Sequence, residues 1–133
     1  MLRDARVGAM IPTQDVARAR EFYEQKLGMT AEDDTAGGAL YRCGDGTSFV
    51  LFPSAGTSSG THTQLGFEVT DIEAEAAEIT ARGVTLDAVE IPGATVENGI
   101  AQLPDGRACW FKDPDGNVIA IFQRTQVPAA AAT

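Results

Sequence analysis

The chain has 133 residues, of which 44% are hydrophobic, and its 19 acidic and 10 basic residues give a formal net charge of −9. This length and composition suit one globular domain that buries a core without disulfide bonds. The acidic surplus argues against a nucleic-acid partner and would attract cationic ligands into a cleft. No apolar run approaches the roughly 18 residues of a membrane span, and the charged N-terminus does not resemble a secretory leader, so we expect a soluble, cytoplasmic protein without a membrane partner.

The first half of the chain predicts a β-α-β-β-β module. Asp15 can cap a helix that ends before Gly28, and we expect this helix over Asp15–Leu27. Its inward-facing apolar residues recur at helical spacing: Val16, Ala19, Tyr23 and Leu27. The strands predicted around the helix are apolar runs bounded by turn residues: Val7–Pro12, Met29–Asp34, Ala39–Cys43 and Ser48–Pro53.

The pattern starts again after the polar, linker-like segment Ser54–Thr61. Thr70 and Glu73 fit a capping box at the start of a helix over Thr70–Arg82. The inward stripe of this helix is Ile72, Ala76 and Ile79. The strands predicted in this half are His62–Val69, Val84–Ile91, a segment near Gly99–Leu103, Ala108–Phe111 and Val118–Phe122.

The last two strands flank the turn Asp113-Pro114-Asp115-Gly116 and therefore predict a closing hairpin. Alternation places one set of its side chains on one face: Ala108, Trp110, Lys112, Val118, Ala120 and Phe122. The opposite face carries Cys109, Phe111, Ile119 and Ile121. Both faces are largely apolar, so one needs a covering layer and the other needs a cleft or a partner. Asp113 and Asp115 are interpreted as turn formers rather than as paired catalytic carboxylates.

The two halves are similar to each other. Asp15-Val16 matches Asp71-Ile72, and Asp45-Gly46 matches Asp115-Gly116, which indicates a duplicated module. One module alone would expose a sheet face. We therefore predict an α+β fold in one domain over residues 1–124, in which two paired βαβββ modules (about 1–56 and 57–124) form a curved mixed sheet around a cleft, with the helices outside. Residues 125–133 are expected to form a flexible tail.

Three segments resemble the vicinal oxygen chelate superfamily: DVARAREFYEQKLGM from Asp15, QLGFEVTDIEAEAAEI from Gln64 and CWFKDPDGNVIAIF from Cys109. This superfamily includes glyoxalase I, extradiol ring-cleaving dioxygenases, fosfomycin-resistance enzymes and bleomycin-binding proteins. The resemblance covers roughly residues 5–124. It implies the fold, but not one activity, because functions on a shared scaffold differ by the residues of the site.

The resemblance also assigns four strand positions to the metal ligands of the family's enzymes, namely Gly8, Val50, Gln64 and Ala120. A transition metal needs about three or four N, O or S ligands, and only Gln64 has a donor side chain here. His62 lies two residues earlier on the same strand, but a pair on one strand cannot surround an ion. We therefore expect no metal and no other cofactor.

The remaining residues on the predicted cleft face mix aromatic and polar groups, as small-molecule pockets do. The predicted ligand-binding residues are Met10, Phe52, His62, Gln64, Glu68, Trp110, Lys112 and Phe122. By resemblance, Trp110 occupies a substrate-contacting aromatic position of fosfomycin-resistance proteins, although ordinary packing at a seam explains it equally well. Glu68 and Lys112 either fix the polar groups of a ligand or pair with each other. His62 is interpreted as a rim residue rather than as a general base.

Two functions remain open at this point. The first is a metal-independent protein of the glyoxalase/bleomycin-resistance type that sequesters a partly aromatic compound, neutral or cationic. The alternative is a glyoxalase- or dioxygenase-like enzyme with an atypical or absent metal site, in which Glu68, His62 or Lys112 serves as acid and base. We expect the binding protein rather than the enzyme, and a homodimer. Cys43 and Cys109 show no metal-ligand spacing and are expected to be reduced, buried thiols rather than a disulfide.

Overall fold

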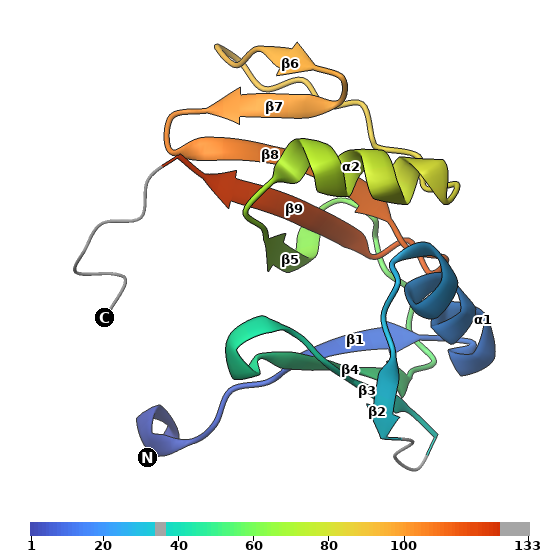
Figure 1. The fold of residues 1–133 in the computed structure, drawn as a ribbon. Coiled ribbons are helices and arrows are strands. Elements are labelled where there is room, and N and C mark those ends of the chain that lie inside the picture. The colour runs from blue at the N-terminus through green and yellow to red at the C-terminus, as the bar shows by residue number, and fades with distance from the viewer. Residues whose placement is uncertain (34–36, 126–133) are drawn as a thin grey trace. The chain divides into compact units, whose positions relative to one another are not determined.

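The computed structural model describes residues 1–33 and 37–125 (Figure 1). The chain divides into two compact units. The first unit contains residues 1–59 together with the turn at 113–117, and the second unit contains residues 60–112 together with the stretch that begins at Val118. The arrangement of both units as one domain over residues 1–124 stays a prediction. The predicted tail lies outside the described residues from residue 126 onward.

The first unit contains a four-stranded mixed sheet with the strand order β1-β4-β3-β2. Its strands are β1 (Ala9–Thr13), β2 (Ala31–Asp33), β3 (Ala39–Arg42) and β4 (Ser48–Pro53). Strand β1 runs parallel to β4, and the other neighbours are antiparallel. A short 3-10 helix, η1 (Leu2–Asp4), precedes β1, and a second one, η3 (Gly44–Gly46), joins β3 to β4. The predicted strands of this half are confirmed, with small shifts at their ends.

The helix of the first unit has two parts, α1 (Val16–Glu21) and a π-helical continuation, η2 (Phe22–Lys26). Asp15 caps α1, because its carboxylate accepts a hydrogen bond from the Arg18 backbone N–H at 3.1 Å. In the second part, the Leu27 N–H donates to the Phe22 carbonyl at 3.3 Å, five residues back. The predicted helix over Asp15–Leu27 is confirmed in extent, and its C-terminal part is wider than an α-helix.

An aromatic cluster fills the core of the first unit. The ring centroid of Tyr23 lies 5.5 Å from that of Phe49 and 6.1 Å from that of Tyr41, and the Tyr41 and Phe49 centroids are 5.1 Å apart. All three side chains are almost fully buried, together with Ile11 and Leu51. Their aromatic faces are therefore covered by one another and by the aliphatic core.

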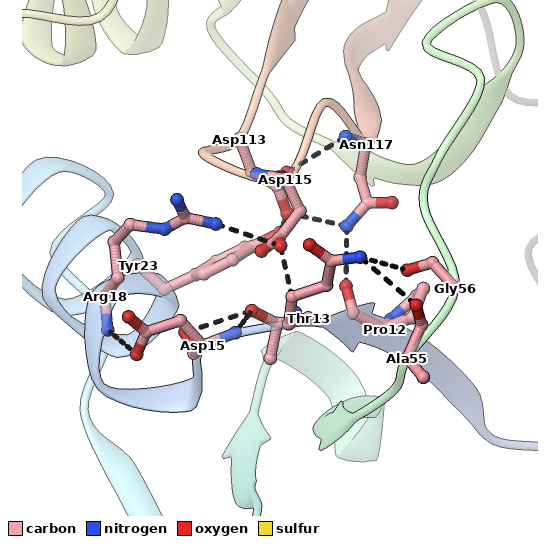
Figure 2. A network of polar contacts seen from close by, with 11 residues as sticks. Pro12, Thr13, Asp15, Arg18, Tyr23, Ala55, Gly56, Asp113, Asp115 and Asn117 are labelled. Atoms are coloured by element: carbon pink, nitrogen blue, oxygen red, sulfur yellow. Dashed lines mark hydrogen bonds and ion pairs between the residues drawn. The ribbon is translucent and has the colours of Figure 1, made fainter.

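The turn at 113–117 belongs to the first unit through a buried polar network (Figure 2). Oδ2 of Asp113 accepts hydrogen bonds from the Tyr23 hydroxyl at 2.8 Å and from Nδ2 of Asn117 at 2.9 Å. Oδ1 of Asp113 accepts from the backbone N–H groups of Asp115 and Asn117, and Nδ2 of Asn117 also donates to the Pro12 carbonyl at 2.9 Å. Asp113 is therefore a turn former, as predicted. Burial, followed by the Asp113 carboxylate, raises the pKa of Tyr23.

The second unit contains a five-stranded mixed sheet with the order β5-β9-β8-β7-β6. Its strands are β5 (Thr63–Glu68), β6 (Val96–Glu97), β7 (Ile100–Leu103), β8 (Gly106–Lys112) and β9 (Val118–Arg124). Its helix is α2 (Ile72–Ala81), whose predicted inward residues Ile72, Ala76 and Ile79 are buried. Strand β5 runs parallel to β9, and the other neighbours are antiparallel.

Two predictions for this half are wrong. Residues Val84–Ile91 form no strand, because β7 is the strand that pairs with β8. The segment is joined to β8 through the Asp87 N–H, which donates to the Trp110 carbonyl at 2.7 Å. The cap of α2 is Asp71 instead of Thr70, since the Asp71 carboxylate accepts from the Ala74 N–H at 3.1 Å.

Both units place their last strand in parallel beside their first strand. This shared strand order supports the predicted duplication. Over the described residues, the fold is α+β, with two mixed sheets of four and five strands and the α-helices α1 and α2. None of the helices in residues 1–33 and 37–125 combines the length and the apolar character that crossing a membrane requires.

Candidate functional site

The sheet of the second unit has one face that packs against α2 and one face without a helix of that unit. Helix α2 packs on β8 and β9 (Figure 1). The buried alternate side chains of these strands are Cys109, Phe111, Ile119 and Ile121. The opposite face is called here the helix-free face. Trp110 pairs with Ala120 and Ala108 pairs with Phe122, so the predicted alternation of the hairpin is confirmed.

Two rows of side chains cross the helix-free face from β8 through β9 to β5. The first row is Trp110, Ala120 and Gly66, and the second row is Ala108, Phe122 and Glu68. Each row combines one aromatic side chain with smaller neighbours. Ala120 and Gly66 therefore form an apolar floor that is bordered by an indole and a phenyl ring.

The two aromatic side chains of the helix-free face, Trp110 and Phe122, are both half-buried. In the described part of the chain, neither ring is in contact with another aromatic ring. The Phe122 ring instead lies against the backbone of β5, where a Cβ added to Gly66 would be 3.3 Å from Cε1 of Phe122. Both rings thus keep aromatic surface that no other ring covers.

Ion pairs fix the charged residues near both ends of this face. Nζ of Lys112 lies 2.8 Å from the Asp87 carboxylate, and the Arg124 guanidinium lies 3.3 Å from the Glu68 carboxylate. All four side chains are partly exposed. Glu68 and Lys112 therefore do not pair with each other, which corrects one of the two sequence interpretations. The sequence does not predict Asp87 and Arg124 as ion-pair partners, because they lie far from Lys112 and Glu68 along the chain.

An open concavity of about 540 Å³ lies beside Trp110. Its lining includes His62, Asp87, Glu90, Trp110, Lys112 and Val118. The structure thus brings together three predicted site residues, His62, Trp110 and Lys112. Strict alternation along β5 stops at a bulge, because Thr63 and not Gln64 pairs with Val118. The register therefore shifts before Leu65, and the placement of His62 and Gln64 on the face of Gly66 and Glu68 stays a prediction.

The other predicted site residues belong to the first unit. Met10 pairs with Val50, and Phe52 follows Val50 on the same face, opposite the buried Phe49 and Leu51. Met10 is 59% exposed, while Val50 and Phe52 are half-buried. Gly8 is exposed just before β1. Met10 and Phe52 stay predicted ligand contacts.

A family model described as the Glyoxalase/Bleomycin resistance protein/Dioxygenase superfamily matches residues 7–121. The chain belongs to this superfamily. The resemblance inferred from the three sequence segments is therefore confirmed. Among curated proteins, none matches the chain.

Solved structures of the superfamily type resemble the chain over most of its length. An antibiotic binding protein from Streptomyces sp. CB03234, TnmS3, is 27% identical, with a TM-score of 0.70 and coverage of 91% of this chain and 97% of that one. A bleomycin-binding protein complexed with bleomycin is 19% identical, with a TM-score of 0.67 and coverage of 90% and 98%. The fosfomycin resistance protein FosX from Listeria monocytogenes is 13% identical, with a TM-score of 0.67 and coverage of 91% and 93%. The last two likenesses concern the fold.

The metal positions that the superfamily resemblance assigns do not suit a metal in this chain. Gly8, Val50 and Ala120 have no donor atom in their side chains, and Ala120 is almost fully buried. Within residues 1–33 and 37–125, no three His, Cys, Asp or Glu side chains gather closely enough to hold an ion. A transition metal needs about three or four such ligands, so these residues do not fit its site.

The thiols do not supply a nucleophile either. Both cysteines are free, and Cys109 is fully buried, as predicted. Cys43 is only half-buried, which corrects the prediction that it is a buried thiol. Burial raises the pKa of Cys109 to about 11 and also raises the pKa of Cys43. A thiol with a raised pKa is protonated at neutral pH and reacts slowly.

Proposed function

We propose that the chain is a metal-independent binding protein that sequesters a partly aromatic compound, neutral or cationic, on the helix-free face of the second unit. One observation carries the proposal. Trp110 and Phe122 border the apolar floor of Ala120 and Gly66, and neither ring contacts another ring in the described part of the chain. A planar ligand on such a ring gains buried area and roughly 0.5–1.5 kcal/mol of stacking energy beyond it.

The charged groups define the expected shape of the ligand. Lys112 with Asp87 and Glu68 with Arg124 stand near the two ends of the face, and both pairs are partly exposed. Exposed ion pairs contribute only about 0–1 kcal/mol, so a polar group of a ligand can replace one partner at low cost. We expect a flat apolar body with polar groups at its ends. The net charge of −9 favours a cation over an anion.

One comparison supports this proposal. TnmS3, which is 27% identical, is an antibiotic binding protein. A physiological role in antibiotic resistance by sequestration, in the cytoplasm, is the corresponding biological proposal.

The proposal is tested by ligand screening on protein purified without added metal. A compound that binds only the native state raises the melting temperature. At a concentration of one hundred times its Kd, it adds about 2.7 kcal/mol to the free energy of unfolding. We expect planar aromatic compounds to raise the melting temperature of metal-free protein. Stoichiometric zinc, nickel, manganese or iron in the purified protein would overturn metal independence.

The alternative is an acid–base enzyme, and one observation favours it. His62 and Lys112 line the same concavity as Trp110, which is how a general acid and base would be placed. Lys112 pairs with Asp87 and Glu68 pairs with Arg124, so an acid–base role requires these exposed pairs to open. Recovery of a bound compound in chemically unchanged form after denaturation supports sequestration, whereas its conversion to a product supports the enzyme.

We also propose a homodimer. Apolar side chains at the start of the first unit are strongly exposed, with Leu2 at 85%, Val7 at 98% and Met10 at 59%. Closed two-fold dimers are the commonest soluble assembly. Sedimentation at micromolar concentration should give the dimer mass, and a monomer alone would contradict the proposal.

A further inference from the structure

We infer that Gly66 is a specificity-determining residue of the proposed site, because it seats the Phe122 ring and so fixes the width of the floor beside Trp110. The inference rests on the proposed function. It adds the class of ligand that the face selects, which is a planar ring system rather than a bulky, non-planar one.

The geometry at Gly66 leaves only one neighbour for a side chain. A Cβ added there would lie 3.3 Å from Cε1 and 3.7 Å from Cδ1 of Phe122, with no other heavy atom within 4 Å apart from the chain neighbours. The shorter distance is tighter than ordinary van der Waals contact, so the ring must move if residue 66 gains a methyl group. The Phe122 ring can lie low over β5 because residue 66 is glycine.

The backbone gives no separate reason for glycine at this position. Gly66 is absent from the positive-φ glycines of the described chain, and it lies inside β5, where alanine is favoured over glycine. The other two residues of the row, Trp110 and Ala120, pair with each other across β8 and β9, so their register does not depend on Gly66. We therefore infer that glycine at position 66 matters for the position of the Phe122 ring and not for the conformation of β5.

A displaced Phe122 ring would narrow the floor. An added methyl group would push the ring by a few tenths of an ångström, and we infer that it moves away from β5 toward Ala120, which lies between Gly66 and Trp110 in the register. A planar compound that fits flat between the two rings would lose part of its contact area. A bulky, non-planar compound rests on the outer edges of the rings and would lose less. Gly66→Ala should therefore lower the preference for planar compounds.

Two organic cations of different shape test this inference by calorimetric titration: proflavine, which is planar, and tetraphenylphosphonium, which is not. We expect Gly66→Ala to weaken proflavine binding about 3- to 10-fold, in line with the loss of one stacking contact, and to change tetraphenylphosphonium binding much less. The melting temperature should be unchanged or slightly higher. Gly44→Ala is the matched control, since Gly44 has no positive φ and no atom within 4 Å of an added Cβ.

A double-mutant cycle separates the role of the ring from any general effect on β5. In the Phe122→Ala background, Gly66→Ala should leave the proflavine affinity unchanged, because no ring remains to be displaced. Proflavine binding that is insensitive to Gly66→Ala, or equally sensitive with and without the Phe122 ring, overturns the inference and leaves the proposed function standing. A wild-type protein that binds neither cation overturns the proposed function and the inference with it.

Discussion

The protein contains two groups of aromatic side chains with opposite environments. In the first unit, Tyr23, Tyr41 and Phe49 pack against one another and are almost fully buried. On the helix-free face of the second unit, Trp110 and Phe122 are half-buried and contact no other ring among the described residues. The first group contributes to stability, because its surfaces are covered, and the second group carries the proposed ligand recognition, because no other ring covers its surfaces.

The same contrast exists between adjacent residues of β8, and it gives the largest expected effect. Phe111 is 1% exposed on the α2 side, whereas Trp110 is half-buried on the helix-free face. Phe111→Ala should lower the free energy of unfolding by about 3–5 kcal/mol through lost burial and a cavity. Urea unfolding measures the loss. A decrease below that of Trp110→Ala would contradict the assignment of the two faces.

The next effect concerns the polar network of the first unit. Tyr23→Phe removes the hydroxyl that donates to Asp113 and leaves Asn117 as the remaining donor to Oδ2. We expect a loss of about 1–3 kcal/mol in unfolding free energy, because a buried hydrogen bond to a carboxylate disappears. Proflavine affinity, measured below the unfolding transition, should stay unchanged, since Tyr23 belongs to the covered group. A coupled loss of affinity would break the distinction between the two groups.

Trp110→Ala should have the reverse profile. The affinity for proflavine should fall about tenfold or more, since the stacking surface and its buried area are lost together. The melting temperature should change less than it does for Phe111→Ala. Unchanged affinity, together with a large drop in melting temperature, would assign Trp110 to ordinary packing.

The smallest expected effect is a dependence of the unfolding free energy on pH, which comes from Cys109 on the α2 side of β8. Burial raises the pKa of Cys109 from its ordinary value of 9.0 to about 11, so the folded state favours the neutral thiol. This contribution is fully present below about pH 9 and is lost as the pH rises toward about 11. Between about pH 9 and 11, urea unfolding should show a smaller loss of unfolding free energy for Cys109→Ala than for the wild type. Equal losses would show that Cys109 titrates normally.

The sequence predicts most of the fold because its signals are local. The Asp15 cap and helical spacing define the first helix, and the Asp113-Pro114-Asp115-Gly116 turn defines the closing hairpin together with its two faces. Competition between segments is not visible locally. Val84–Ile91 has the composition of a strand, but β7 pairs with β8 in its place. The bulge beside Gln64 shifts the pairing of β5 with β9, whereas strict alternation predicts one register along the whole strand.

The candidate site is predicted only in part for the same reason. Trp110, Phe122 and Glu68 could be placed on one face from alternation, and the register agrees with that placement. The ion-pair partners Asp87 and Arg124 lie 25 and 56 positions away from Lys112 and Glu68 (112 − 87 and 124 − 68), and no periodic pattern connects them. The role of Gly66 depends on where the Phe122 ring lies, which a sequence pattern does not contain.

The most direct test of the account uses the indole N–H of Trp110, which gives one side-chain signal because the chain has a single tryptophan. A proton–nitrogen correlation NMR spectrum is recorded while proflavine is added. We expect the indole signal to shift strongly, through the ring current of the stacked ligand, with the same Kd that calorimetry gives. Saturable binding of proflavine that leaves the indole signal in place would put the ligand elsewhere and contradict the central claim.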